Sequence, residues 1–383
     1  MKRGCTQCGE CLNVCPVYRQ FTREEYSPKG KRLLMEPLAP EFGGDERAAE
    51  LNWESVRSLA RLCAGCDRCR KACARKLSTA DLLADVRATH PHWTQHFWQL
   101  WIARMGPLWP SLGLMATLVP DGLTPKPLKP LHDTAKILAD RGEARPWGRI
   151  RKNPESRTDV SKPVLLFSGC TANNVRKKWS SGANDLLLAW GYELSDPGGF
   201  VCCGGTMHHA GRYGAQRAME GQNVEYWRKS GKPRIAVFCA SCFHSLHGYA
   251  GGVLTGNEAG EWLAALTPVS VLLAGAEVEH TEAKPAAYGY HQPCHWGDND
   301  NDIKFLQRLF PGLHKGTGLC CGMGGILQMS NPGLSRRMAE STLDGFPGAI
   351  SRIVTGCSGC VMQLNAAAGG DMRIEHWLDL VSL

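Results

Sequence analysis

The chain's 18 cysteines constrain its fold and chemistry more than any other feature of the 383-residue sequence. Two runs of four precede residue 85, none lies between residues 86 and 160, and the others follow residue 161. The chain reaches Cys5 without an apolar leader, so export to an oxidising compartment is not indicated. We therefore expect metal ligands rather than a disulfide framework.

The first two runs have the spacing of bacterial ferredoxins. Cys5, Cys8, Cys11 and Cys15 are followed by Pro16, which is the C-x2-C-x2-C-x3-C-P pattern of a [4Fe–4S] cluster. A zinc site needs only one or two separated CxxC pairs, so three evenly spaced cysteines favour iron. In such proteins the fourth cysteine of each run ligates the other cluster. The second run has alanine after its last cysteine, and the predicted ligand sets are Cys5, Cys8, Cys11 with Cys73, and Cys63, Cys66, Cys69 with Cys15.

The remaining cysteines belong to an internal repeat. Each copy has a single cysteine, an adjacent pair followed by glycine, and a CxxC pair. The first copy contains Cys170, Cys202, Cys203, Cys239 and Cys242, and the second contains Cys294, Cys320, Cys321, Cys357 and Cys360. Since every cysteine of the chain falls in one of the four groups, none is left over as an ordinary small core residue.

Apolar runs lead into these cysteines. Four such runs end at cysteines, at 164–170, 234–242, 286–294 and 352–360. Stretches of helical character, such as 179–190 and 301–310, alternate with these runs. Buried strands alternating with helices predict an α/β layout with a parallel sheet. Sites in such folds gather at the carboxyl ends of the strands, which is where the cysteines lie.

These patterns predict a multidomain α+β protein with four segments. A helical ferredoxin-type domain with two [4Fe–4S] motifs covers 1–85, including a helical stretch near 45–61. A helical, aromatic linker and docking segment covers 86–160. Two repeated α/β modules follow at 161–275 (the first module) and 276–383 (the second module).

The linker contains a long apolar stretch at 97–119. Its length raises a membrane-spanning helix, but Arg104, Pro107 and Pro110 argue against one. Two interpretations remain. The stretch forms two short helices packed on the protein's own core, or it presents Trp98, Trp101 and Trp109 as an exposed surface for a partner or a membrane interface.

The repeated pattern, C-x31-CC-x35-C-x2-C and C-x25-CC-x35-C-x2-C, resembles the paired cysteine-rich CCG domains of the heterodisulfide reductase family. With two ferredoxin motifs in front, the chain resembles the D subunits of that family and related components of membrane-bound redox complexes in sulfate reducers. The resemblance implies a non-cubane [4Fe–4S] cluster in each module beside the two cubane clusters. It also implies disulfide chemistry at the pair, with Cys203 and Cys321 as the catalytic cysteines.

Four histidines near the repeat are candidate proton carriers, because histidine titrates near neutrality. His208 and His209 follow the first cysteine pair, and His291 and His295 flank Cys294. Of these, His295 is the candidate catalytic histidine. The alternative is that all four are hydrogen-bonded loop residues.

A second family shares the architecture: the iron–sulfur subunits of glycolate, lactate and anaerobic glycerol-3-phosphate dehydrogenases. The stretch 26–32 resembles their segment after the ferredoxin motifs. Those subunits commonly lack part of a CxxC pair, whereas both pairs are complete here, which favours the heterodisulfide reductase type. The alternative function is an electron relay for a flavin-dependent dehydrogenase.

Charge and motifs bear on partners. The net charge of +8 is spread along the chain without a basic stripe, so we expect no nucleic-acid binding. No GxGxxG or Walker sequence occurs, so hydride chemistry would belong to a partner such as a flavoprotein. We expect a peripheral subunit on the cytoplasmic face of the membrane, bound to a membrane-embedded quinone or haem subunit. A third hypothesis makes the modules a scaffold with other metals or none.

Overall fold

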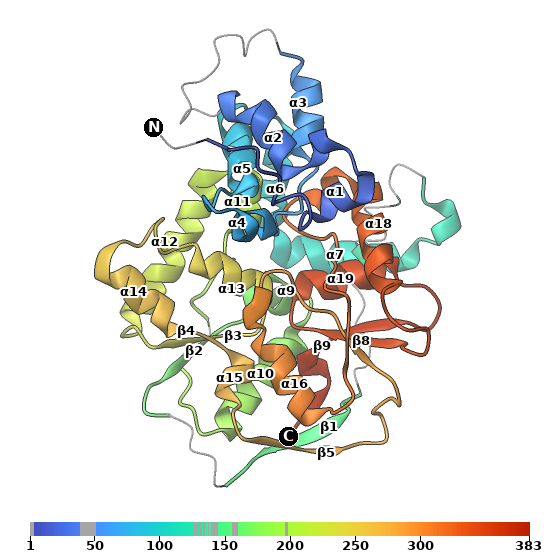
Figure 1. Cartoon of the computed structure of the whole chain (residues 1–383). Coiled ribbons are helices and arrows are strands. Elements are labelled where there is room, and N and C mark those ends of the chain that lie inside the picture. Colours follow the sequence, from blue (N-terminus) through green and yellow to red (C-terminus); the bar gives the residue numbers. More distant parts are fainter. Residues whose placement is uncertain are drawn as a thin grey trace.

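The computed structural model describes residues 4–38, 51–125, 145–154, 160–195 and 198–383, with a few single positions between 129 and 138. Its helices and strands form an N-terminal helical lobe, drawn blue at the top of Figure 1, above two α/β modules. Part of the helical stretch expected near 45–61 lies outside the described residues. The remainder forms the helix α3, Trp53–Ala60. The residue boundaries of the four predicted segments stay predictions.

Short helices joined by the cysteine loops build the N-terminal lobe. They are α1 (Pro16–Phe21), α2 (Pro28–Met35), α3, α4 (Arg68–Ala72) and α5 (Thr79–Thr89). Cys15 caps α1, with its sulfur accepting a hydrogen bond from the Tyr18 amide at 3.4 Å. The buried Lys31 of α2 donates hydrogen bonds to the carbonyls of Tyr26 and Leu62. This lysine therefore ties α2 to the loop of the second cysteine run.

Each module contains a small parallel sheet, which confirms the predicted α/β layout. The first sheet has the order β2-β3-β4, and the second has the order β7-β6-β8-β9. An isolated bridge between Val164 and Leu194 extends the first sheet beyond β2, as β7 extends the second beyond β6. The strands are β2 (Val164–Phe167), β3 (Arg234–Val237), β4 (Leu266–Pro268), β6 (Gly289–Tyr290), β7 (His314–Lys315), β8 (Arg352–Thr355) and β9 (Arg373–His376). The two modules thus repeat one strand order.

Helices cover both sheets. Those of the first module are α9 (Gly169–Asn174), α10 (Lys177–Ala189), α11 (Gly205–His209), α12 (Tyr213–Lys229), α13 (Ala240–His247), α14 (Gly256–Ala265) and α15 (Val269–Leu272). Those of the second are α16 (Asn301–Leu309), α17 (Leu327–Ser330), α18 (Pro332–Leu343) and α19 (Ser358–Ala367). In α10, Trp179, Ala183 and Leu186 recur at helical spacing and are buried. The predicted helical stretches 179–190 and 301–310 correspond to α10 and α16.

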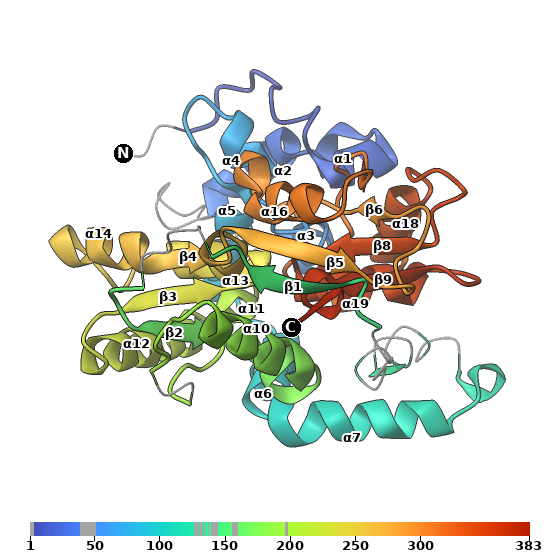
Figure 2. The same ribbon diagram turned by 90° about the horizontal axis from the view of Figure 1, so that it is seen from below.

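A third sheet joins the modules, and the sequence did not indicate it. It has the order β10-β1-β5, with β1 (Gly148–Lys152) antiparallel to β5 (Ala276–His280) and parallel to β10 (Val381–Ser382). Figure 2 shows β1 and β5 lying across the base of the molecule beside the C-terminus. The sheet therefore connects the linker, the first residues of the second module and the end of the chain.

The linker forms two helices against the core, which confirms one of its two interpretations. These are α6 (Thr94–Ala103) and α7 (Met105–Leu118). Trp98, Trp101 and Trp109 are 9%, 7% and 5% exposed, so the expectation that they form an exposed docking surface is wrong. They pack inward because the cysteine-bearing loops of both modules leave an apolar space beneath them. Within the described ranges, no helix has the length and apolar character needed to cross a membrane.

Tryptophan oxidation of the folded chain with N-bromosuccinimide tests this packing. We expect Trp93, which is 70% exposed, to react first, while Trp98, Trp101 and Trp109 stay protected. Peptide mapping by mass spectrometry measures the order, and the urea-unfolded chain, in which all four should react, is the control. Early reaction of Trp101 or Trp109 would contradict the inward packing.

Candidate metal centres

The eight N-terminal cysteines line two small cavities. Cys5, Cys8, Cys11 and Cys73 line one, together with Cys69. The other is lined by Cys15, Cys63, Cys66 and Cys69. Cys73 therefore lies with the first run and Cys15 with the second, in agreement with the predicted ligand sets. Cys69 lines both cavities. Ligation itself stays a prediction.

The two N-terminal cavities differ in their access to solvent. Cys8 of the first is exposed, whereas Cys15 and Cys66 of the second are buried. Burial raises the pKa of the Cys15 thiol above its ordinary value, although the positive charge of the neighbouring Lys31 opposes this rise. The first cavity therefore lies near the surface, and the second lies inside the molecule.

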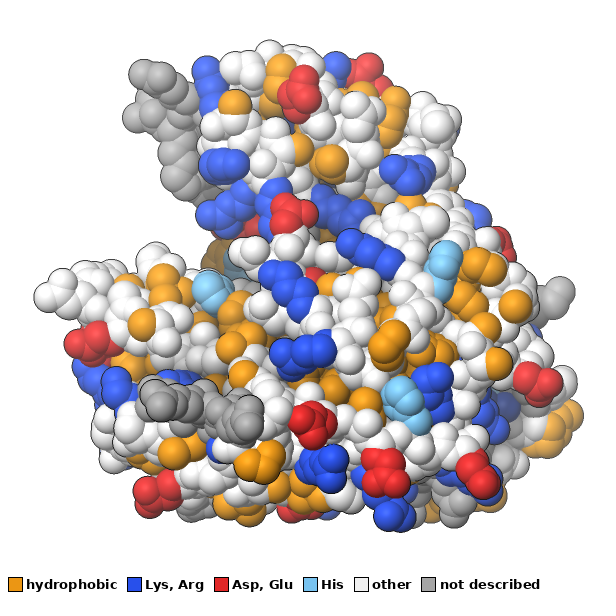
Figure 3. Space-filling model, turned by 60° about the horizontal axis from the view of Figure 1, so that its bottom comes forward, with side chains coloured by type: hydrophobic (Ala, Val, Ile, Leu, Met, Phe, Trp, Pro, Cys, Tyr) orange, Lys and Arg blue, Asp and Glu red, His pale blue; other side chains and the backbone are white. Residues whose placement is uncertain are grey.

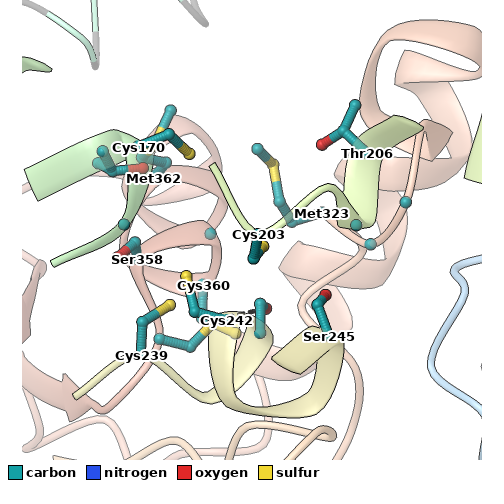
Figure 4. A pocket seen from close by; sticks show the side chains of 18 of the residues that line it. Cys170, Cys203, Thr206, Cys239, Cys242, Ser245, Met323, Ser358, Cys360 and Met362 are labelled. Atoms are coloured by element: carbon teal, nitrogen blue, oxygen red, sulfur yellow. Dashed lines mark hydrogen bonds between the residues drawn. The ribbon is translucent and has the colours of Figure 1, made fainter. Parts of the chain in front are cut away.

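All ten cysteines of the two modules line one shared cavity of about 190 Å3. They meet because each parallel sheet delivers its cysteines at the carboxyl ends of its strands, and the two sets of ends face one another. Cys239 follows β3 and caps α13, while Cys357 follows β8 and caps α19. Figure 4 shows Cys203, Cys239, Cys242 and Cys360 around the same space, with Cys170 near its rim. The resemblance implied a pair of clusters that act together, and the structure places both sets of cysteines around one cavity.

The ten thiols form one continuous series of contacts. The series passes through the first module and crosses to the second where Cys239 meets Cys357. Cys321 and Cys360 lie 3.2 Å apart, and Cys357 also lies 3.1 Å from the Ser241 hydroxyl. The order along the series is Cys170, Cys202, Cys203, Cys242, Cys239, Cys357, Cys360, Cys321, Cys320 and Cys294. The second half therefore repeats the first in reverse.

This donor set fits iron–sulfur clusters. Every cysteine is a free thiol, and most of the ten around the cavity are buried. Each module offers five sulfur donors in mutual contact, and thiolate sulfur selects zinc, copper(I) or iron–sulfur clusters over hard cations. Five sulfur donors exceed the four that a tetrahedral zinc ion accepts, which favours a cluster over a single zinc ion in each module.

The N-terminal lobe contacts the second module through its cysteine loop. A Cβ atom at Gly324 would lie 1.7 Å from the Ala64 carbonyl oxygen, so only glycine fits this approach. The loop from Cys320 to Gly325 carries two more residues than its counterpart in the first module. Arg68, beside Cys66, donates a hydrogen bond to the Gly318 carbonyl at 2.6 Å. Burial lowers the pKa of Arg68, whereas the neighbouring Cys320 and Cys294 thiolates raise it above its ordinary value.

The four candidate histidines have different surroundings. His208 lies 3.0 Å from Asp81; burial lowers its pKa, but the bond to Asp81 raises it above the ordinary value. His209 lines the cavity, and burial lowers its pKa well below the usual range. His295 also lines the cavity; its ring nitrogens lie 3.1 Å from the Ser241 hydroxyl and 3.3 Å from the Gly65 carbonyl. His208 and His295 thus have the hydrogen bonds that the loop interpretation describes, and the catalytic role of His295 stays a prediction.

His291 is the most enclosed of the four. It is 2% exposed, and its Nε2 atom has no hydrogen-bond partner among the described residues. Burial lowers its pKa to about 4, so the ring is neutral at physiological pH. A ring nitrogen of His291 and the sulfur atoms of Cys321 and Cys360 all lie within 4.8 Å of one another.

An aromatic wall completes the cavity, and the sequence did not assign it to this site. Trp98, Trp101 and Trp109 line the space together with Ile326 and apolar methionines, among them Met323 and Met362. The linker contains no cysteine, so nothing in its sequence connects it with the cysteine modules. Arg68 and Ser241 each lie next to a cysteine in the sequence, but only folding brings Arg68 near Cys320 and Ser241 near Cys357.

Two family models match the chain. A 4Fe-4S dicluster domain matches residues 2–77, and a cysteine-rich domain, CCG, matches residues 164–247 and 288–365. Both matches agree with the fold and with the cysteine patterns, and they indicate iron–sulfur clusters.

Several relatives align over nearly the whole chain. The probable glycolate oxidase iron-sulfur subunit of Bacillus subtilis is 22% identical, covering 99% of this chain and 93% of the relative. The D subunit of dihydromethanophenazine:CoB–CoM heterodisulfide reductase from Methanosarcina acetivorans is 21% identical with the same coverage. The B subunit of fumarate reductase (CoM/CoB) from Methanothermobacter marburgensis is 22% identical, covering 100% of this chain and 72% of the relative. The chain therefore belongs to the CCG-domain iron–sulfur electron-transfer proteins and is a distant homologue of heterodisulfide reductase D subunits and of glycolate oxidase iron-sulfur subunits.

Proposed function

We propose that this chain is the iron–sulfur subunit of a membrane-associated redox complex and that its CCG cavity performs disulfide–thiol chemistry. The observation that carries the proposal is the shared cavity, in which the thiols of both modules form one series. A pure electron relay needs its clusters only within transfer distance of one another. It does not need both sets of thiols to line one space that a substrate can share.

The reaction needs two electrons and two protons for each disulfide that becomes two thiols. When bound, the clusters supply one-electron transfer. Cys5, Cys8, Cys11 and Cys73 would hold one cubane cluster, and Cys15, Cys63, Cys66 and Cys69 the other, while each module's five cysteines would hold a non-cubane one. Around the cavity, Ser241, Ser245 and Thr206 place hydroxyl groups beside the thiols, and Trp98, Trp101 and Trp109 form an apolar part of the wall that would exclude water.

Electrons would pass between the N-terminal lobe and the cavity through the second module. Cys66 lies close enough to Cys320 for the charge of one to raise the pKa of the other's thiol. The contact of Gly324 with Ala64 brings the two loops together, and Arg68 places a positive charge between them. The N-terminal lobe also contacts the first module, where Gly65 lies against the His209 ring and His208 lies 3.0 Å from Asp81. The choice of the second module therefore rests on the closeness of Cys66 to Cys320.

The redox partner would dock near the first N-terminal cavity. Its Cys8 is exposed, and exposed basic side chains surround the last cysteine of the set, namely Arg70, Lys71, Arg75 and Lys76. Figure 3 shows Lys and Arg side chains gathered across the narrow part of the molecule below the upper lobe. We propose an acidic surface on a membrane-embedded quinone or haem subunit as the partner, which would hold this chain at the cytoplasmic face of the membrane.

The cavity favours an uncharged substrate. Among the described residues that line it there is no Lys, Arg, Asp or Glu, and burial lowers the pKa of both lining histidines, His209 and His295. An anionic group brought among these side chains would lose its hydration without gaining a cationic partner. We therefore propose that the part of the substrate that reaches the thiols is neutral.

Iron content and a cysteine substitution test the function. We expect the anaerobically purified chain to contain about 16 iron atoms, four for each of four clusters. Cys203→Ser should abolish disulfide reduction by reduced viologen and leave the ferredoxin-type EPR signals, because it removes one donor from the first module alone. The matched control is Cys8→Ser, which should alter a ferredoxin-type signal. Full disulfide turnover in Cys203→Ser would contradict the proposal, and a co-purifying flavoprotein with no disulfide turnover would favour the dehydrogenase relay.

The proposed electron route predicts an effect of Gly324→Ala. The added methyl group must push the second module's loop away from Ala64, so reduction of the module clusters by a donor acting at the N-terminal lobe should slow at least about tenfold. Stopped-flow absorption under anaerobic conditions measures the rate. Gly348→Ala is the control, because a Cβ there meets nothing within 4 Å. Equal rates in both variants would rule out this route.

Two disulfides of similar size test the preference for neutral substrates. Bis(2-hydroxyethyl) disulfide is neutral, whereas 3,3′-dithiodipropionate carries two carboxylates at pH 7. An unpaired buried charge costs several kcal/mol, so kcat/KM for the anion should be at least about tenfold lower. Viologen-coupled turnover provides the measurement. A higher kcat/KM for the anionic disulfide would contradict the proposal that the substrate group reaching the thiols is neutral.

A further inference from the structure

The two modules differ at the residue three positions before their first cysteine. In the first module this residue is Phe167, the last residue of β2. In the second it is His291, which follows β6 and continues its pairing through a hydrogen bond to the Val354 carbonyl at 2.9 Å. Because β2 and β6 hold the same place in the repeated strand order, Phe167 and His291 occupy corresponding positions beneath the cysteines.

These two side chains have opposite chemical requirements. Phe167 is buried against Phe200, with ring centroids 5.1 Å apart, and needs no polar partner. His291 is equally buried, yet its Nε2 atom has no hydrogen-bond partner among the described residues. An orphaned nitrogen in a buried position is rare in proteins and calls for an explanation such as a bound ion.

The surroundings of His291 supply that explanation. A ring nitrogen of His291 lies within 4.8 Å of the sulfur atoms of Cys321 and Cys360, which are themselves 3.2 Å apart. Imidazole nitrogen and thiolate sulfur both bind iron, and their bonds to a first-row metal such as zinc are about 2.0–2.3 Å long. One iron atom of a cluster in the second module is therefore within reach of both kinds of donor.

We propose that His291 is a nitrogen ligand of the iron–sulfur site in the second module, a donor that the first module lacks. The proposal rests on the clusters assigned under the proposed function. It makes the two modules unequal: the first holds its iron with cysteine alone, and the second adds a neutral ligand. The potential of an iron–sulfur centre depends on its ligands, so the clusters of the two modules would differ in reduction potential.

Pulsed EPR of protein labelled with 15N-histidine tests the ligand directly. In the wild-type chain we expect a hyperfine coupling from a directly bound nitrogen, which changes from the 14N to the 15N pattern on labelling. This coupling should disappear in His291→Phe, which gives the second module the residue of the first. The midpoint potential of the second-module signal should shift in the same variant, while the ferredoxin-type signals keep theirs.

His295→Gln is the matched control. His295 adjoins Cys294, but its nitrogens already face Ser241 and Gly65, so the coupling should persist in this variant. If His291→Phe fails to fold, His291→Asn takes its place, and the labelling of the wild-type chain stands by itself. A coupling absent from the wild-type chain, or retained without His291, overturns the inference.

Iron analysis separates this inference from the proposed function. About 16 iron atoms per chain with no nitrogen coupling would leave the function standing and remove the histidine ligand alone. About 8 iron atoms per chain would remove the module clusters, and with them both proposals.

Discussion

The structure depends on the packing of ten cysteines, most of them buried, around one cavity at the meeting of two parallel sheets. Cysteine thiols are poor hydrogen-bond partners, so a cluster of this size contributes little to folding through hydrogen bonds alone. The surrounding elements hold the two sets of strand ends face to face. The β10-β1-β5 sheet joins the modules at the base, and the N-terminal lobe joins them at the cysteine loops. Contacts between segments far apart in the chain therefore keep the two cysteine sets together.

The repeat is symmetric in its cysteines but not in its surroundings. The N-terminal lobe contacts the cysteine-pair loop of the second module, where two additional residues, including Gly324, permit a close backbone approach. Arg68 adds a positive charge on this side, and His291 adds a buried nitrogen. The two copies of the repeat therefore have different environments.

The linker contains no cysteine, yet it forms part of the wall of the cysteine cavity. Its tryptophans wall the cysteine cavity, so the segment without cysteines controls the polarity around the thiols. The opposite side of α7 leaves Leu114, Met115 and Leu118 exposed. The apolar stretch, which is interrupted at Arg104 between α6 and α7, thus forms a cover over the site.

Local sequence patterns were sufficient to predict the cysteine chemistry and the elements that carry it. Ferredoxin spacing, the exchange of Cys15 and Cys73, the repeat and the α/β layout all follow from spacing and periodicity within short segments. Tertiary packing alone brings the two five-cysteine sets into one cavity, lines it with the linker tryptophans, and leaves His291 unpartnered among the described residues beside Cys321. These are contacts between segments far apart in the chain, and hydrophobic periodicity states which face of an element is buried but not what that face meets.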